Sequence, residues 1–438
     1  MASTGLSKTF SGAGTNNKKG TISFWLKRSG ISSAQSFGLQ TAGAGGGTAG
    51  LYFDSSDTLY FYLAYTSGSW KGLLRTNRKF RDTNAWYHFV VAWDTTQATE
   101  SNRLKLYVNG VQETSFSTEN YPPQDQATTF GNAQAHYINY SGSSNYFDGV
   151  MSHFYYTDGY TYAASDFGST DSTTGEWKIN TSPSVTYGTN GFLILKDGMT
   201  ITDQSSNSND FTLATGTLTK TEDCPSNVFA TYNSLQNLND NNILSNGNTT
   251  QKETSTVGQR QAICNIGGFT GKYYAEFKMI NLGPQNGSSP YCGVLSMSNY
   301  DNDTYLGNNG IAMHPGGNIY RSASVIDSQT SITYTTNSIV SVALDITNNK
   351  CHFRVNGGSW LGSGDPVNNT GGYDISSLNT GDGMTFASSV FNNNCQWSVN
   401  FGNGYFGTTA VSSAGTNASN NGIFEYDVPT GYTALSTK

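Results

Sequence analysis

The fold is decided by two short stretches, RLKLYVNGVQ at residues 103–112 and KCHFRVNGGSW at residues 350–360. Each alternates apolar with polar residues and then reaches an Asn-Gly pair, Asn109-Gly110 in the first and Asn356-Gly357 in the second. Asn and Gly tolerate the positive φ of a tight turn better than other residues do. Both stretches are therefore predicted to be strands that end in tight turns, and the first is predicted to be a hairpin.

Alternation separates the side chains of each strand into two faces. The apolar faces carry Leu104, Leu106 and Val108 in the first stretch and Cys351, Phe353 and Val355 in the second. The opposite faces carry Lys105, Tyr107, His352 and Arg354, which we expect to meet water. One apolar and one wet face are typical of an antiparallel sheet packed on one side. Because the pattern occurs twice, it predicts two sandwiches.

Composition favours an all-β protein. The chain has 438 residues, enough for two or three domains, with 50 Gly, 27 Tyr and 23 Phe. Aromatic and β-branched residues punctuated by Gly and Asn are typical of strands joined by tight turns. Charged residues make up only 12% and the formal net charge is -7. This charge gives no reason to expect nucleic acid or an anionic membrane as a partner.

Alternating segments recur along the chain, and helical periodicity is nearly absent. They span residues 20–30, 50–65, 86–94, 103–116 and 145–160, and then 227–233, 271–280, 291–297, 338–360, 383–391 and 396–406. The predicted fold is all-β, with two tandem antiparallel β-sandwiches, the first a jelly roll.

Neither a targeting segment nor a cysteine motif is apparent. The N-terminal MASTGLSKTFSGAG lacks a positive start followed by an apolar core, and no apolar run is long enough to span a bilayer. We therefore expect a protein made in a cytoplasm without a signal peptide and without membrane insertion. Without a CxxC motif, buried free thiols are expected, and a disulfide between two of the last four cysteines stays open. The cysteines are Cys224, Cys264, Cys292, Cys351 and Cys395.

The two regions resemble two known folds. TISFWLKRS, WYHFVVAWD, LKLYVNG and FDGVMSHFYYTD follow one another within residues 1–165, and this order resembles the concanavalin A-like, laminin-G-like jelly roll. GKYYAEFKM, YCGVLS, VSVALDITNNKCHFRVNGGSW and QWSVNFGNGYF lie within residues 227–438 and resemble the SPRY sandwich. Residues 166–226 are expected to be a connector that contributes strands.

A further resemblance covers nearly the whole chain. LSKTFSGAGTNNKKGTISFWLKRSG, DQSSNSNDF followed by DCPSNVFATYN, and WSVNFGNGYF followed by GIFEYDVPTGYTAL are similar to surface proteins of tailed bacteriophages. This resemblance implies a virion component exposed at the virion surface, with other virion proteins as partners.

No catalytic constellation is apparent. The sequence lacks the Glu-x-Asp-x-x-Glu pairing of acids, the G-x-S-x-G turn and the H-E-x-x-H metal spacing. Glu276 and Glu425 are lone acids and are expected on the solvent side of strands. His88 and His153 lie in apolar strands and are expected to be structural. No catalytic residue is predicted, and the chain is expected not to be an enzyme.

Calcium is the one cofactor that the jelly-roll resemblance suggests, because laminin-G-like domains often bind it with carboxylates and loop carbonyls. The acids that we select as candidate ligands are Asp54, Asp57 and Asp148.

A carbohydrate site is the leading functional hypothesis. Tyr and Trp combine an apolar ring face with a polar tip, which suits the C–H face and the hydroxyls of a sugar. The candidate ligand-binding residues are Trp70, Tyr121, Tyr137, Tyr140, Tyr146, Tyr305, Trp360 and Tyr373. For each of them, packing or a subunit contact is the competing interpretation.

Three functions follow from these observations. The first is a tail-fibre or adhesin-like component that binds a glycan or protein on the host surface. The second is a decoration or connector protein of the capsid or tail without a ligand of its own, and the third is a polysaccharide depolymerase. The sequence leaves a homo-oligomer open. It has no heptads for a coiled-coil trimer, so any trimer would form through the faces of the sandwiches or through partners.

Overall fold

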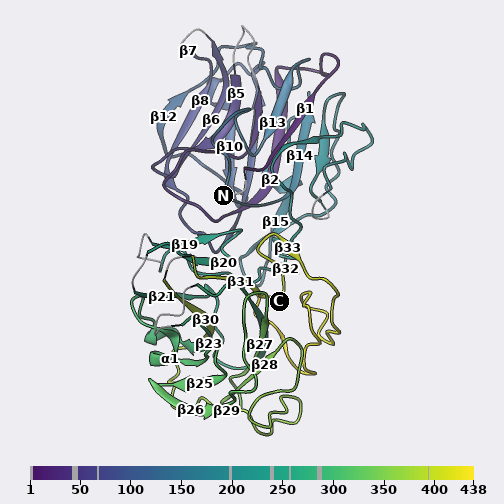
Figure 1. The fold of residues 1–438 in the computed structure, drawn as a ribbon. Coiled ribbons are helices and arrows are strands. Elements are labelled where there is room, and N and C mark those ends of the chain that lie inside the picture. The colour runs from purple at the N-terminus through teal and green to yellow at the C-terminus, as the bar shows by residue number, and fades with distance from the viewer. Residues whose placement is uncertain are drawn as a thin grey trace. The chain divides into compact units, whose positions relative to one another are not determined.

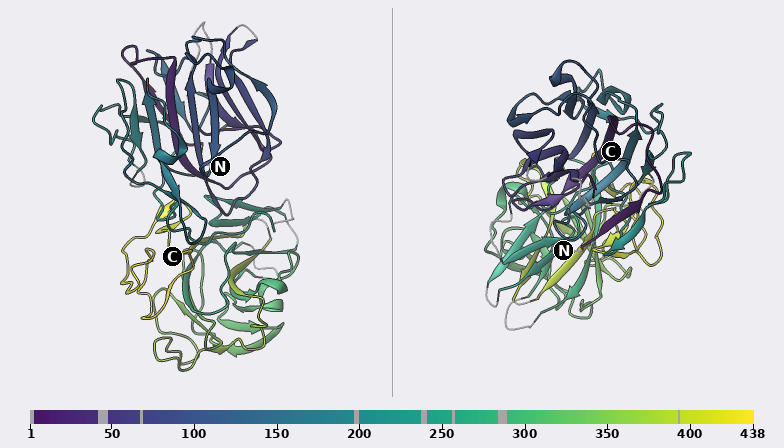
Figure 2. Two further views of the ribbon diagram at one scale, coloured as in Figure 1. Left: turned by 180° about the vertical axis from the view of Figure 1, so that it is seen from behind. Right: turned by 90° about the horizontal axis from the view of Figure 1, so that it is seen from above.

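The computed structural model describes residues 3–41, 48–66, 69–196, 200–236, 241–255, 258–283, 289–392 and 394–438. Strands dominate it. Its short helices are α1 (Leu306–Asn309), η1 (Glu100–Asn102), η2 (Ala164–Asp166) and η3 (Met297–Asn299). The chain divides into two compact units, Met1–Lys220 and Thr221–Lys438 (Figures 1 and 2). The prediction of an all-β chain with two tandem antiparallel β-sandwiches is confirmed.

The first unit has two layers. The back layer is one sheet in the order β11 (Val111–Gln112), β10 (Leu104–Val108), β9 (Trp86–Asp94), β2 (Lys19–Arg28), β14 (Gly149–Asp158) and β17 (Phe192–Ile194). The front layer contains β12 (Phe116–Asn120), β8 (Leu73–Lys79), β6 (Thr58–Thr66), β5 (Thr48–Phe53) and β3 (Gln35–Ser36), with β7 (Ser69–Trp70) beside β6. It continues with β4 (Leu39–Thr41), β13 (Ala135–Ile138), β1 (Gly5–Thr9) and β18 (Thr212–Thr215).

Alternation within the strands places the core between these layers. Ile22, Phe24 and Leu26 of β2 are completely buried and belong to one apolar cluster with Leu51 of β5 and Phe61 of β6. These residues alternate with others that point out of the sandwich, as the pleat of a strand requires.

The segment after residue 165 is part of the first unit. β17 pairs with β14, and β18 pairs with β1, so this segment supplies strands to both layers. It also forms the hairpin of β15 (Gly168–Thr170) and β16 (Trp177–Ile179). Phe167 and Leu193 pack with Val90 and Tyr155 on the outer side of the back layer. The first unit therefore extends to Lys220, beyond the jelly-roll region that the sequence outlined.

The second unit also has two sheets around one core. One sheet contains β19 (Asn242–Ser245), β20 (Thr250–Glu253), β31 (Gln396–Asn400), β22 (Lys272–Asn281), β27 (Ile339–Asp345), β28 (Lys350–Val355) and β29 (Tyr373–Asp374), with β34 (Thr433–Ala434) beside β22. The other contains β21 (Gln259–Ile263), β30 (Met384–Phe391), β23 (Tyr291–Ser296), β24 (Ile311–Met313), β25 (Asn318–Arg321) and β26 (Ser324–Ser328). A hairpin of β32 (Tyr405–Phe406) and β33 (Thr409–Ala410) stands apart.

The expectation of a wet face on β28 is wrong. His352 is 0% exposed and Arg354 is 8% exposed. The C-terminal segment accounts for the burial of Arg354, because its guanidinium donates to the backbone carbonyl of Asp427 and stacks over Trp360 at 4.6 Å. A covering segment can satisfy polar side chains, so alternation alone does not show which face of a sheet meets water.

Both Asn-Gly turns form as predicted, with φ of 48° and 80° at Asn109 and Gly110 and of 49° and 70° at Asn356 and Gly357. The first joins β10 to β11 as a hairpin. Each Asn also binds the neighbouring strand. The side chain of Asn109 accepts from the His88 N–H at 2.8 Å, and that of Asn356 accepts from the Ile339 N–H at 2.8 Å.

Candidate functional site

The outer side of the front layer carries four aromatic residues, which we call the aromatic face: Tyr52, Tyr60, Tyr62 and Trp70. The rings of Tyr52 and Tyr60 stack at 4.6 Å, because the two residues are directly opposed on β5 and β6. Tyr62 meets Trp70 edge-on at 5.0 Å. None of the four belongs to the core cluster between the layers.

Local sequence explains this arrangement. Leu59, Phe61 and Leu63 of β6 are fully buried, so the intervening tyrosines must point outward. Gly50 lies opposite Tyr62. A β-carbon at Gly50 would lie within 2.5 Å of the Gln40 side chain, so the missing side chain lets Gln40 extend across β5.

Polar groups flank the aromatic rings. The Tyr62 hydroxyl donates to Gln40 Oε1 at 3.2 Å, and the Arg75 guanidinium lies 4.9 Å from the Tyr60 ring. Arg75 also forms an ion pair with Asp54 at 2.7 Å, which compensates its charge. Burial raises the pKa of Tyr52, Tyr60 and Tyr62, so their hydroxyls stay protonated at neutral pH.

Tyr137, Tyr140 and Tyr146 form a second group on the front layer. Tyr137 is directly opposed to Gln40, and its ring is 5.1 Å from that of Tyr140, which stacks on Tyr146 at 5.5 Å. Tyr140 is only 5% exposed. For Tyr140 the structure therefore favours packing over ligand binding, because its neighbours cover the ring.

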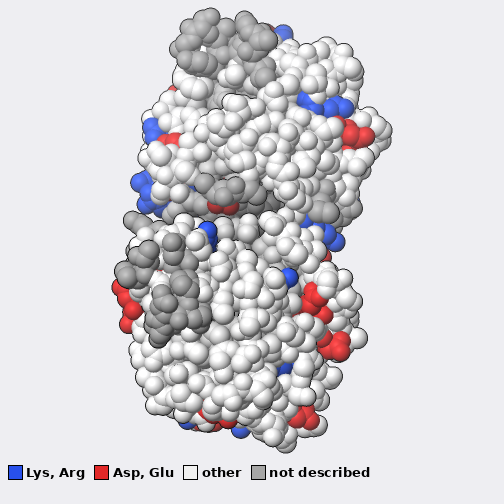
Figure 3. Space-filling view, viewed as in Figure 1, with Lys and Arg blue, Asp and Glu red and all other residues white. Residues whose placement is uncertain are grey.

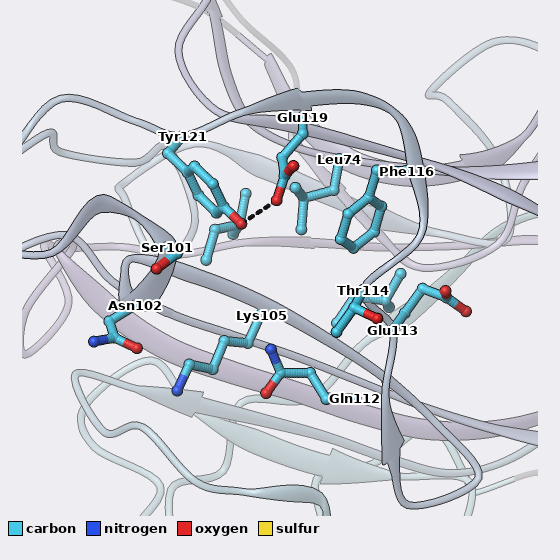
Figure 4. Close-up of a pocket in the computed structure, with 12 residues that line it drawn as sticks. Leu74, Ser101, Asn102, Lys105, Gln112, Glu113, Thr114, Phe116, Glu119 and Tyr121 are labelled. Atoms are coloured by element: carbon cyan, nitrogen blue, oxygen red, sulfur yellow. Dashed lines mark hydrogen bonds between the residues drawn. The ribbon is translucent and has the colours of Figure 1, made fainter.

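Tyr121 lies in a separate place, beside a hollow of about 260 Å³. Its hydroxyl donates to Glu119 (Figure 4). The lining residues are Leu74, Ser101, Asn102, Leu104, Lys105, Leu106, Gln112, Glu113, Thr114, Phe116, Glu119 and Tyr121. Of the predicted residues, the structure thus brings Trp70 to the aromatic face and Tyr121 to this hollow.

The three predicted residues of the second unit lie apart from one another. Tyr305 is half-buried beside Tyr291 and Tyr320, and Trp360 packs on Arg354. Tyr373 is 6% exposed, belongs to the core and donates to Asp327 at 2.7 Å. The structure therefore does not support a ligand site at Tyr373, because its ring lies inside the unit.

The candidate calcium ligands are engaged elsewhere. Asp54 binds Arg75, and Asp57 forms ion pairs with Arg28 at 3.0 Å and Arg81 at 2.8 Å. Burial raises the pKa of the Asp148 carboxyl, which disfavours the ionised form that calcium requires. In the described ranges, no group of three His, Cys, Asp or Glu side chains could hold a metal ion. The structure does not support the predicted site, because arginines compensate two of its three carboxylates.

The expectation that Glu276 faces solvent is also wrong. Its side chain is completely buried and accepts from the Tyr274 hydroxyl at 2.9 Å. The N–H groups of Glu425 and Tyr426 donate to it at 2.8 Å each. Burial raises the pKa of Glu276 to about 7, although these hydrogen bonds and the nearby Arg354 oppose the shift. Glu276 therefore fastens the C-terminal segment to β22.

The histidines in apolar strands hold structure together, as predicted. The Trp177 indole N–H donates to His88 Nδ1 at 2.9 Å, and His88 Nε2 lies 2.9 Å from Ser23 Oγ. Burial lowers the pKa of His88 to about 3, so the ring is neutral. His153 has a φ of 50° and lies 2.7 Å from Ser152 Oγ. Four of the five cysteines are buried, and all five are free thiols.

Comparison with known proteins agrees with the fold of the first unit. Residues 4–165 match the concanavalin A-like lectin/glucanases superfamily. This match covers less than half of the chain, and it confirms the predicted concanavalin A-like jelly roll for that part. A search of curated proteins finds no match to the chain.

The solved structures that match this chain are distant from it in sequence. The SPRY domain of human HERC1 is 12% identical, with a TM-score of 0.29, and the match covers 36% of this chain and 91% of that domain. A heptameric SAP-like pentraxin from Limulus polyphemus is 15% identical, with a TM-score of 0.26 and coverage of 35% and 70%. Stonustoxin is 14% identical, with a TM-score of 0.26 and coverage of 40% and 27%.

Two further observations concern the surface charge and the helices. On the surface shown in Figure 3, most side chains are uncharged, and the charged ones lie in small separate groups. No helix of the described segments is long and apolar enough to cross a membrane.

Sequence reasoning missed Tyr52, Tyr60 and Tyr62. Their signal was present in GLYFDSSDTLYFYLAY (residues 50–65), where tyrosines alternate with Leu and Phe across two strands. From the sequence we took this stretch only as an alternating segment. The alternation itself places the tyrosines together on the side away from the core.

Proposed function

We propose that this chain is a non-enzymatic virion surface protein that binds a neutral glycan of the host surface through the aromatic face. The observation that carries the proposal is the row of rings on the outer side of β5, β6 and β7, where Tyr52, Tyr60 and Trp70 are partly exposed. The match of residues 4–165 to a family described by its lectins and glucanases supports it.

The chemistry of the aromatic face suits a sugar. Aromatic rings pack against the C–H face of a pyranose, and hydroxyl or amide groups beside them exchange hydrogen bonds with its hydroxyls. Tyr62 and Gln40 supply such groups. Because Asp54 compensates the charge of Arg75, the face has little net charge and favours a neutral over an acidic glycan.

The virion setting rests on the resemblance of the sequence to phage surface proteins. Attachment to a host would place the first unit against a surface polysaccharide, and other virion proteins would hold the chain. A binding role is favoured over hydrolysis, because the sequence lacks the Glu-x-Asp-x-x-Glu pairing of acids that would supply the two carboxylates of glycoside hydrolysis.

A glycan array with the full-length chain tests the proposal. We expect neutral glycans to bind, and Tyr60→Ala and Trp70→Ala each to weaken binding about tenfold, or about 1.4 kcal/mol. Tyr160→Ala is the matched control, because Tyr160 is an exposed tyrosine outside the aromatic face. Absence of any bound glycan, or equal loss in the control, would contradict the proposal. Blocking of phage adsorption by the purified chain would extend it to the virion.

A decoration or connector role is the second candidate, because the second unit exposes apolar side chains. Phe269 is 69% exposed, and Val325 on the edge strand β26 is 49% exposed. Exposed apolar residues are typical of protein contacts when they gather in patches. This role predicts that Phe269→Ser reduces incorporation of the chain into particles without changing glycan binding.

A further inference from the structure

The hollow beside Tyr121 lies at the edge of the first unit. β12 is the edge strand of the front layer, and β10 and β11 form the edge of the back layer. The hollow lies between these two edges, and its volume is about 260 Å³. Leu74 lines it, whereas the preceding Leu73 pairs with Tyr62 of the aromatic face. The hollow and the aromatic face thus open on different sides of β8.

The inner wall of the hollow offers little apolar surface to a ligand. Leu74, Leu104 and Leu106 are 1%, 2% and 0% exposed, since they belong to the core. The partly exposed groups are the rings of Phe116 and Tyr121 and the polar side chains around them. Such a lining suits a small ligand with hydroxyls and one apolar face, rather than an alkyl chain.

Hydrogen bonding within the hollow is partly organised before any ligand arrives. Tyr121 donates to one carboxylate oxygen of Glu119, as Figure 4 shows, and this bond orients the carboxylate. Burial and the neighbouring Glu119 raise the pKa of Tyr121 to about 12, so its hydroxyl keeps the proton. A carboxylate accepts several hydrogen bonds, and the amides of Asn102 and Gln112 add donors and acceptors across the hollow.

The charges around the hollow favour a neutral sugar over an anionic one. The lining contains two carboxylates, Glu113 and Glu119, and one ammonium group, Lys105. The guanidinium of the adjacent Arg103 donates to the backbone carbonyls of Gln97, Ala98 and Pro122. Arg103 keeps its positive charge but is held at these carbonyls and does not line the hollow, and Glu100 adds negative charge near Tyr121. An anionic sugar would therefore meet more carboxylates than ammonium groups among the side chains that line the hollow.

We propose that this hollow binds a single neutral pyranose, with its C–H face on the rings of Phe116 and Tyr121 and its hydroxyls on Glu119, Asn102 and Gln112. The volume fits one ring, since it is just below the roughly 300 Å³ at which ordinary ligand pockets begin. This site is separate from the aromatic face and does not depend on the function proposed for it.

Ligand-observed saturation-transfer NMR on the full-length chain tests the proposal. The probes are the methyl pyranosides of glucose, galactose and mannose, with methyl glucuronide as the acidic counterpart. We expect at least one neutral probe to bind saturably at millimolar concentration and the glucuronide to bind more weakly. Glu119→Gln should raise the Kd about tenfold, because a hydrogen bond to a charged group is lost. Tyr121→Phe should raise it as well.

Matched controls separate this site from general effects and from the aromatic face. Glu176→Gln and Tyr160→Phe change exposed residues elsewhere in the same unit and should leave the Kd unchanged. Tyr60→Ala should also leave it unchanged, even where it abolishes binding of a longer glycan. Absence of saturable binding by any neutral probe would overturn the proposal. Binding that survives both hollow variants unchanged, or preference for the glucuronide, would overturn it too.

Discussion

At the scale of single residues, the second unit is held together by buried polar contacts. The residues that make them occupy the polar positions of alternating strands, so the sequence alone suggests that they are exposed. Glu276, Ser341 and Arg354 are directly opposed across β22, β27 and β28. Tyr274 donates to Glu276, and Arg354 donates to Tyr274 at 3.1 Å. These contacts join the sheet to the C-terminal segment, and Glu276 is the titratable group among them that changes charge near neutral pH.

Glu276 makes the stability of the second unit depend on pH. Its pKa is about 7 in the fold and 4.5 in the reference state, so the fold favours the protonated form. The stabilisation is complete below about pH 4.5 and is lost as the pH rises through about 7, with a total effect of about 3 kcal/mol. Glu276→Gln should abolish this loss in urea denaturation between about pH 5 and pH 8.

The opposite effect of His352 and a control variant at Glu425 help to interpret the urea denaturation. Burial lowers the pKa of His352 to about 4, so its protonation destabilises the fold at low pH and stability rises from about pH 4 to 6.5. This trend is opposite in sign and is shared by the parent chain and the variant, so their difference isolates Glu276. Glu425→Gln is the control, because Ser412 binds that carboxylate at the periphery. An unchanged slope in Glu276→Gln would refute the assignment.

At the scale of elements, the two Asn-Gly turns solve one packing problem in the same way. A β-carbon at Gly110 would lie 2.4 Å from the ring of Trp177, and one at Gly357 would lie 2.5 Å from the ring of Tyr426. In each unit an aromatic residue from a later segment therefore covers the glycine of the turn. The glycine provides positive φ and also room for that ring.

A substitution at Gly357, compared with one at another glycine of positive φ, separates backbone strain from overpacking. Gly357→Ala should destabilise the second unit through backbone strain of about 1–2 kcal/mol and overpacking against Tyr426 of about 1–3 kcal/mol. Gly381→Ala is the matched control, because Gly381 has a φ of 93° and no atom within 4 Å of its added β-carbon. It should show the strain alone. Equal effects of the two variants in chemical denaturation would show that Tyr426 does not restrict the turn.

The sequence alone was sufficient to predict the strands, but not to predict which segments cover the sheets or where a hollow forms. The apolar sets of β2, β6 and β28 follow from period-two alternation, and the Asn-Gly turns follow from backbone conformation. Alternation could not show that Arg354 and Glu276 are buried, because the C-terminal segment that covers them lies 73 positions from Arg354 and 150 positions from Glu276. The hollow beside Tyr121 could not be predicted from the sequence either, since it depends on the spacing between the edges of two sheets.

At the scale of the whole molecule, each unit has the features of an independent domain. Each has its own large apolar cluster between two sheets, and the division lies between Lys220 and Thr221. Each also covers one of its sheets with a segment of its own chain, in the first unit around Phe167 and in the second around Phe424. Units of about 220 residues are large enough to bury a stable core.

We therefore expect residues 1–220 and 221–438 to fold when they are produced separately. Each fragment should show a cooperative thermal transition and the β-sheet circular dichroism of a folded sandwich, because neither takes core residues from the other. The first fragment should retain the glycan binding of the full-length chain, and the second should retain the effect of pH on Glu276. A fragment 1–165 is the informative comparison, because it lacks β17 and β18. It should be unstable, and its stable folding would place the end of the first domain at the jelly roll instead.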